Sequence, residues 1–356
     1  MNMGCIFSWF RSRSNPQHFE QVQDEAPKVY SWDKKDRSKA QDFIIENHKG
    51  EILGRMPGTV DGQQLVIQNC QECNIYVFDY SATVSIDDCT NCNIILGPVK
   101  QSVFVRDSHE CRLVVACQQF RARDCRHIDS FLLCETQPVI ESSSKMRFAS
   151  FKFNYPELES HLKASELSIF NNNWSNIHDF TPVPEEGLNY TYLPEDAKVE
   201  DFIPLPTAEP FSTILVSTDA NHCIIPQTLG LRRKPSDEGC LIVFFNDGGS
   251  HDRAVNLIHL MKRQHPDCPL VQTKEIIMHP EDAFRIFSTQ SYASAVKQGA
   301  VIGLEFCGPQ VMRKCQACVV AIMTGTTGLV FVSQQASSAR SQINSFFHFA
   351  NMQMGL

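Results

Sequence analysis

The residues whose chemistry stands out lie in the run QQFR at residues 118–121, where a cation follows two amides and an aromatic ring. Arg121 is followed closely by Arg123 and Arg126. Because side chains alternate between the two sides of a strand, a strand here would place Arg121 and Arg123 on one face. The run is therefore either a solvated basic edge or a patch that meets an anion.

Glu141 begins the polar run ESSS, 20 residues after Arg121. That distance is close to one period of the repeat described next, so we expect Glu141 to lie beside Arg121 and to orient its guanidinium. An arginine held in this way can enter the active site of another protein. There it stabilises the charge that develops in phosphoryl transfer, an effect of roughly 10³- to 10⁵-fold in rate. Arg121 is thus a candidate arginine finger.

A repeat spanning residues 65–140 must position these side chains. Its copies LVIQNCQECNIYVFDYSAT, VSIDDCTNCNIILGPVKQS and VFVRDSHECRLVVACQQFR follow one another with a period of 19 residues. Short β-branched runs alternate with polar residues within each copy, which indicates two or three short strands. A fixed period of this size is typical of stacked units, so the sequence predicts a β-coil stack with cysteine and isoleucine ladders inside. The fourth copy slips register by two residues, and Cys125 and Ile128 resume the ladders.

The repeated cysteines also allow a metal site. Cys70-x-x-Cys73 and Cys89-x-x-Cys92 have the spacing of a four-cysteine zinc site. The residues between the pairs are strand-like, however, and Ser108 stands where the third copy would need a cysteine. Small, weakly polar thiols also suit a tight coil interior. We favour stacked core thiols and predict no metal ligands, with zinc as the alternative.

Composition limits the functional classes. A chain of 356 residues with 42% hydrophobic and 20% charged residues is typical of a globular protein of two domains. The net charge of -8 argues against a nucleic-acid partner. Fifteen cysteines, an odd number, without a secretory signal indicate free thiols in a reducing compartment. No apolar run approaches the length of a membrane span.

The N-terminal stretch carries a lipidation pattern. Read from Met3, the sequence MGCIFS fits the myristoylation motif, with Gly4 as the acceptor and Cys5 as a palmitoylation site. Two acyl chains would give stable membrane binding, whereas one gives only marginal binding. Myristoylation requires translation from Met3, because Met1 and Asn2 otherwise precede the glycine; a chance match in a disordered tail is the alternative.

Shifts in composition divide the chain. We expect a flexible acylated tail at 1–26, a β-helix domain at 27–182 closed by the aromatic stretch 148–158, and a connecting segment and linker at 183–238. The connection is expected to pack along the first domain. The remainder, 239–356, has a different rhythm.

The C-terminal part reads as strands and helices in the order βαβ followed by αβαβα. That order predicts an antiparallel or mixed sheet with helices on one face, of the ferredoxin-like class seen in nucleoside diphosphate kinases. Those enzymes need a nucleophilic histidine in an Asn-x-x-His-Gly-Ser-Asp setting. The nearest string, GSHD at 249–252, lacks the flanking order, so we expect no kinase activity.

Several motifs together resemble the X-linked retinitis pigmentosa protein 2 family. They are CQQFRARDC, DDCTNCNIILGPVK, TQPVIESSS, LSIFNNNWSNIHDFTPV and FANMQMG, and the first domain is also similar to tubulin-folding cofactor C and to the C-terminal domain of cyclase-associated proteins. The resemblance covers nearly the whole chain from Tyr30 onward, and the Gly4-Cys5 terminus. It implies a right-handed parallel β-helix followed by the ferredoxin-like domain.

The resemblance also implies a function: activation of GTP hydrolysis by the small Arf-like protein 3, without hydrolytic chemistry of the chain's own. Arg121 would be the finger, Gln118 would help to place the catalytic groups, and Glu141 would hold Arg121. Gln101, Ser102 and the 118–121 run (Gln118, Gln119, Phe120, Arg121) would line the GTP. The partner GTPase would supply GTP and magnesium.

Members of that family are dually acylated and act at the plasma membrane and the ciliary base in the transport of lipidated cargo. The expected location is therefore the cytoplasmic face of the plasma membrane and the cilium. The alternative function is a non-catalytic scaffold that binds the GTP-bound GTPase or tubulin-folding partners.

Overall fold

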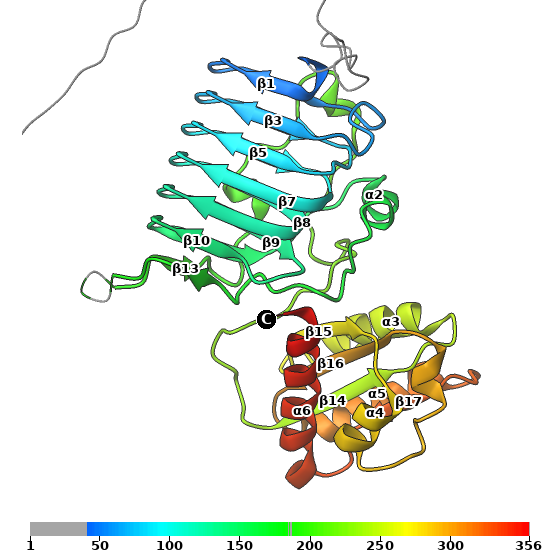
Figure 1. Ribbon diagram of the computed structural model, residues 1–356. Helices are drawn as coiled ribbons and strands as arrows, with labels where there is room; N and C mark the ends of the chain where they lie inside the picture. The colour runs from blue at the N-terminus through cyan, green and yellow to red at the C-terminus, as the bar shows by residue number, and fades with distance from the viewer. Residues whose placement is uncertain (1–40, 184, 186, 356) are drawn as a thin grey trace, which may run out of the picture. The chain divides into compact units, whose positions relative to one another are not determined.

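The computed structural model describes residues 41–183, 185 and 187–355. The first part is a parallel β-solenoid, in which strands of successive coils stack on one another (Figure 1). One face is built by β1 (Ile44–Glu46), β3 (Leu65–Gln68), β5 (Val84–Asp87), β7 (Val99–Arg106), the end of β8 (Arg112–Arg123) and β10 (Val139–Glu141). The second face is built by β2 (Ile52–Arg55), β4 (Asn74–Val77), β6 (Asn93–Leu96), the start of β8, β9 (Asp129–Cys134) and β11 (Met146–Ser150). The predicted parallel β-helix is confirmed.

The coils have unequal lengths. Strand pairing aligns Val84 with Val103 and Val103 with Phe120, so the second of these coils is two residues shorter than the first. The predicted slip of the fourth copy is therefore confirmed. The following coil is longer by a single residue, since Arg121 pairs with Val139.

Each coil turns at residues in the left-handed backbone region, which Asn and Asp adopt more readily than most side chains. One such row of turn residues consists of Asn69, Asp88, Asp107 and Asp124, with φ between 50° and 54°. The periodic polar residues of the sequence thus mark the corners of the solenoid.

The interior of the solenoid holds the predicted thiol ladders. Cys70, Cys89 and Cys92 are fully buried free thiols, and Cys92 Sγ donates to the carbonyl oxygen of Cys70 at 3.4 Å. Burial raises the pKa of the Cys125 thiol to about 11. In the described part of the chain, no group of three or more His, Cys, Asp or Glu side chains is placed to hold a metal ion. The predicted stacking of thiols in the core is confirmed.

Two further short strands extend the solenoid, and the second of them belongs to the connecting segment 183–238. β12 (His178–Asp179) pairs with β10, and β13 (Tyr190–Tyr192) pairs with β11. The expectation that this connection packs along the first domain is confirmed. The aromatic stretch 148–158, which was expected to close the solenoid, begins in β11 and ends at the first residue of helix α2 (Leu158–Ala164). Its rings, Phe148, Phe151, Phe153 and Tyr155, are buried.

The C-terminal part is an antiparallel sheet with the strand order β15-β16-β14-β17. Its elements are β14 (Gly239–Phe244), α3 (Ser250–Gln264), β15 (Leu270–Ile276), α4 (Pro280–Phe287), β16 (Val301–Cys307), α5 (Val311–Met323), β17 (Val330–Val332) and α6 (Ala336–Met354). The first strand, β14, lies between the third, β16, and the fourth, β17, as in a ferredoxin-like fold, so the predicted α+β class is confirmed.

The prediction that helices cover one face of this sheet is wrong. Ile242 of β14 packs in a cluster with Leu257 of α3 and Cys315 of α5, whereas Val243 packs in a separate cluster with Phe346 of α6. Helices therefore cover both faces. The strand CLIVFF is apolar at every position because both of its sides are buried.

Among the described residues, no helix combines the length and the apolar character needed to cross a bilayer.

Candidate functional site

The candidate site lies on the outer surface of β8, where this long strand crosses from the second face of the solenoid to the first. Phe120 and Ala122 point inward and are buried, whereas Arg121 and Arg123 are exposed. Because strand side chains alternate, Arg121 and Arg123 share the outer surface, as the sequence predicted.

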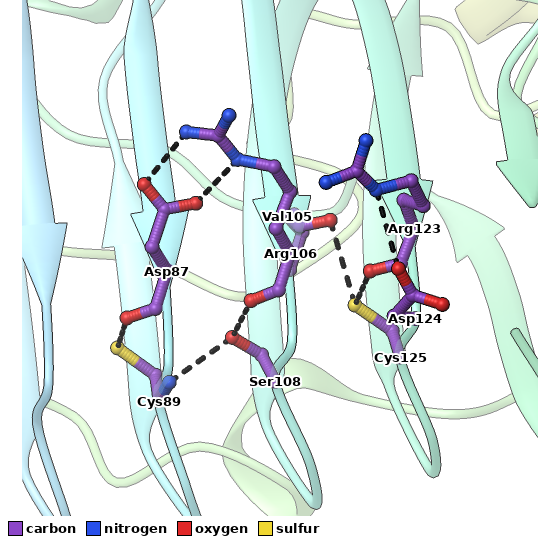
Figure 2. Close-up of polar contacts among 8 residues, drawn as sticks. All are labelled: Asp87, Cys89, Val105, Arg106, Ser108, Arg123, Asp124 and Cys125. Atoms are coloured by element: carbon purple, nitrogen blue, oxygen red, sulfur yellow. Dashed lines mark hydrogen bonds and ion pairs between the residues drawn. The ribbon is translucent and has the colours of Figure 1, made fainter. Parts of the chain in front are cut away.

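Arg106 and Arg123 lie in a row of outward-facing residues that strand pairing aligns across the coils. Two other members of this row, Asp87 and Glu141, carry carboxylates. Arg106 Nε and Nη2 donate to the two carboxylate oxygens of Asp87 at 2.6 and 2.8 Å, and Arg123 Nε lies 3.2 Å from Asp124 Oδ2 (Figure 2). The hydrogen bond to Asp87 raises the pKa of the Arg106 guanidinium. Arg106 is therefore fixed against the solenoid by two hydrogen bonds, whereas Arg123 has a single acidic partner at the surface.

Arg121 lies in the adjacent row of outward-facing residues, which contains Ser85, Phe104 and Val139 and no acidic side chain. Its register partners are Phe104 on one side and Val139 on the other. Neither can accept a hydrogen bond from a guanidinium through its side chain. In the part of the chain that the structure describes, the Arg121 side chain makes no hydrogen bond or ion pair. It is an exposed cation whose neighbours do not neutralise it.

The expected position of Glu141 is not observed. Strand pairing aligns Glu141 with Arg123, whereas Arg121 aligns with Val139. No hydrogen bond or ion pair joins Glu141 to Arg121 in the structure. Glu141 would lie beside Arg121 only if this coil were 20 residues long. Strand pairing gives a coil of 18 residues, so Glu141 lies two positions beyond the residue that pairs with Arg121. The carboxylate stays on the same outer surface, and its role in catalysis stays a prediction.

The amides of the predicted site differ in position. Gln119 aligns with Ser102, whose hydroxyl donates to Gln119 Oε1 at 3.2 Å. Gln119 is two residues from Arg121 and thus on the same surface. Gln118 is exposed at the bend of β8, where its carbonyl oxygen accepts from Thr136 N at 2.9 Å. Gln101 accepts from the Thr83 hydroxyl at 3.3 Å in the neighbouring row.

The structure therefore brings Ser102, Gln119 and Arg121 together on one surface, with Gln101 and Gln118 at its border and Phe120 inside the core. Phe104 and Val139, which flank Arg121, were not predicted from the sequence. They are the residues one coil before and one coil after Arg121. The repeat of 19 residues does not locate them, because these two coils are shorter than the repeat, as the strand pairing shows.

An aromatic cluster continues the row of Arg121. Val139 aligns with His178 of β12, and the ring of His178 contacts Phe180 edge-on with centroids 4.4 Å apart. Phe180 is 60% exposed, which is unusual for a ring of this size. The row thus offers a cation flanked by apolar surface, an arrangement typical of a protein-binding site.

The predicted lipidation residues, Gly4 and Cys5, lie outside the described residues.

Comparisons with known proteins agree with this architecture. A family model described as "Tubulin binding cofactor C" matches residues 62–180, which span the repeated coils and the arginine surface. Tubulin-specific chaperone C of Homo sapiens is 26% identical over 156 residues, which cover 43% of this chain and 45% of that protein.

Other relatives match along the whole chain. Protein XRP2 of Homo sapiens is 50% identical over 356 residues, which cover 99% of this chain and 100% of that protein. Protein XRP2 of Danio rerio is 50% identical over 335 residues, with coverage of 93% and 88%. The chain therefore belongs to the Protein XRP2 family, with a tubulin-cofactor-C-like solenoid as its first part.

Proposed function

We propose that this chain is a GTPase-activating protein for a small Arf-like GTPase of the Arf-like protein 3 type, and that it inserts Arg121 into the nucleotide site of that partner. The observation that carries the proposal is the contrast on β8. Both arginines are exposed, but Arg123 forms an ion pair with Asp124, whereas Arg121 has no polar side-chain partner among the described residues. A finger must be free in the unbound protein and must become desolvated in the complex.

The surroundings of Arg121 fit this role. Phe104 and Val139 would be covered by the partner, and exclusion of water strengthens the interaction between a guanidinium and the charge on a transferring phosphoryl group. Gln119, fixed by Ser102, would approach the same nucleotide. The GTPase would supply GTP and magnesium, so this chain needs no cofactor.

Single-turnover GTP hydrolysis by the GTPase tests the proposal. Arg121→Ala should lower the stimulated rate by roughly 10³- to 10⁵-fold while binding to the GTP form is largely retained. Arg121→Lys should also be inactive, because an ammonium lacks the planar fork of donors. Arg123→Ala is the matched control: it removes an exposed cation from the same strand surface and should keep most of the stimulation.

The same experiment separates the proposal from a scaffold function. If the parent chain binds the GTP form tightly without accelerating hydrolysis, the chain is a non-catalytic effector. The tubulin-related names of its relatives favour tubulin-folding partners as the second possibility, and a pull-down of tubulin that is unaffected by Arg121→Ala would support it.

Membrane attachment is part of the proposed function. Acylation of Gly4 and Cys5 in a chain translated from Met3 would hold the activator at the cytoplasmic face of the plasma membrane and at the cilium, where hydrolysis would release the GTPase after it delivers lipidated cargo. Met3-initiated chains should incorporate myristate, and Gly4→Ala should abolish it. Absence of myristate from both would contradict this part alone.

A further inference from the structure

A cleft of about 510 Å³ lies apart from the arginine surface, and its walls include Lys152, Trp174, Gln227 and Arg232. None of these residues takes part in the proposed GTPase activation. The cleft combines cations with buried polar atoms that lack partners, so it has the features of a binding site rather than of a packing defect.

Arg232 is fixed in this cleft without being neutralised. Its guanidinium carbon lies 5.1 Å from the centre of the Trp174 ring and 5.7 Å from that of Tyr192, and one Nη donates to the carbonyl oxygen of Leu193 at 2.5 Å. Its Nε is buried and has no hydrogen-bond acceptor within the described part of the chain. Stacking therefore orients the guanidinium and leaves a donor unused.

Lys152 brings a second cation into the same cleft. Its ammonium donates to the carbonyl oxygens of Glu195 at 2.7 Å and Ala197 at 3.3 Å, so one of its three protons is free. Burial, followed by the charge of Arg232, lowers the pKa of Lys152. The carboxylates of Glu195 and Asp196 are exposed at the rim, and neither forms an ion pair with Lys152 or Arg232 in the described structure.

Gln227 adds an unused acceptor. Its amide nitrogen donates to the carbonyl oxygens of Phe151 at 2.7 Å and Ile225 at 2.9 Å, which fixes the orientation of the amide. The amide oxygen is then buried without a donor among the described residues. A hydroxyl group of a ligand would satisfy it.

We propose that this cleft binds a phosphate monoester that carries a neighbouring hydroxyl group, with the phosphate on Arg232 and Lys152 and the hydroxyl on Gln227. A phosphate provides the oxygen acceptors that Arg232 Nε and the Lys152 ammonium lack, and Arg suits it because hydrogen bonds between charged groups are the strong ones. The aromatic stacking keeps the guanidinium in place before the ligand arrives, which lowers the entropy lost on binding.

Isothermal titration of the full chain with glycerophosphate, with inorganic phosphate and with glycerol tests the site. We expect glycerophosphate to bind more tightly than inorganic phosphate, and glycerol not to bind. Lys152→Gln and Arg232→Gln should each weaken glycerophosphate binding by about ten- to a hundredfold, the effect of losing a charged hydrogen bond. Lys49→Gln is the control, since Lys49 is an exposed cation outside this cleft and its loss should leave the affinity unchanged.

Circular dichroism confirms that each variant is folded, and Arg232→Lys supplies a milder change that keeps the charge but removes Nε. Equal affinity of the parent, Lys152→Gln and Arg232→Gln chains for glycerophosphate, or no binding by the parent, would overturn the proposal. Flotation with phosphatidylcholine vesicles that contain a phosphatidylinositol phosphate separates the two sources of the ligand. Vesicle binding lost in Lys152→Gln identifies a lipid headgroup, and glycerophosphate binding without vesicle binding identifies a soluble phosphate ester.

Discussion

At the scale of single residues, the neighbours of Arg121 in adjacent coils decide whether its guanidinium is free to contact a partner protein. A carboxylate one coil away captures Arg106, and the same arrangement holds Arg147 to Asp129 at 2.6 Å. Arg121 has Phe104 and Val139 in the corresponding positions. The solenoid therefore keeps this arginine free by placing apolar residues where it elsewhere places acids.

We therefore predict that Val139→Asp inactivates the proposed finger although Arg121 itself is unchanged. The new carboxylate would stand beside Arg121 in register, form an ion pair and hold the guanidinium on the solenoid surface. The stimulated rate of GTP hydrolysis should fall by at least about tenfold, because the finger must break a charged hydrogen bond to reach the nucleotide.

Ser85→Asp is the control for that experiment. Ser85 lies in the same row and aligns with Phe104, so a carboxylate there has no arginine beside it. It should leave the rate near that of the parent. Equal losses in both variants would show that added negative charge, rather than capture of Arg121, is responsible.

The sequence placed Arg121 on the correct outer face of the strand, because alternation along a strand is a local property. The position of Glu141 depends on coil length, which shortens between β7 and β8 and recovers only in part between β8 and β10. An error of two residues leaves a side chain on the same surface but beside a different partner. Local periodicity was therefore enough to predict which surface carries Arg121. Which residues lie beside it in the neighbouring coils could be determined only from the strand register of the structure.

At the scale of elements, the cysteine ladder contains a serine for a physical reason. The Ser108 hydroxyl donates to the carbonyl oxygen of Arg106 at 2.8 Å and accepts from the backbone N–H of Cys89 at 3.1 Å (Figure 2). Ser143 repeats this arrangement with Cys125 N at 3.0 Å. Ser108 therefore satisfies a buried donor at the turn of the coil, and the sequence showed only a missing cysteine.

Ser108→Ala should lower the free energy of unfolding by about 1–3 kcal/mol, because it leaves the buried N–H of Cys89 without an acceptor. Urea denaturation measures this loss. Ser85→Ala, at a half-buried outer position without a side-chain hydrogen bond in the described structure, should change stability by less than about 0.5 kcal/mol. A Ser108→Ala chain as stable as Ser85→Ala would mean that the hydroxyl serves only to fill space.

At the scale of the whole molecule, the sequence predicted the order of strands and helices in the C-terminal part but not their layers. An apolar strand such as CLIVFF is compatible with a sheet covered on both faces. Only the two separate clusters around Ile242 and Val243 show that α3 and α5 cover one face and that α4 and α6 cover the other. Long-range packing of this kind leaves no periodic signal in a strand that is buried on both sides.

Long-range contacts also join three segments of the solenoid around His161. Its Nδ1 lies 2.9 Å from the Tyr155 hydroxyl, and its Nε2 lies 3.6 Å from Asp79 Oδ1. Asp79 in turn accepts from the backbone N–H groups of Val60 at 2.6 Å and Asp61 at 2.8 Å. Burial lowers the pKa of His161 from its ordinary value of 6.5, and the charge of Asp79 opposes this shift only in part.

A histidine whose pKa is lower in the folded state takes up its proton more readily after unfolding. The stability that it contributes is therefore complete above pH 6.5 and is lost as the pH falls through the lower, folded value. Urea midpoints measured from about pH 8 to pH 5 should fall more steeply for the parent than for His161→Gln, which cannot titrate there. His109→Gln removes an exposed histidine and should retain the steep fall of the parent; equal slopes for the parent and His161→Gln would show that protonation of His161 does not limit the stability of the solenoid in acid.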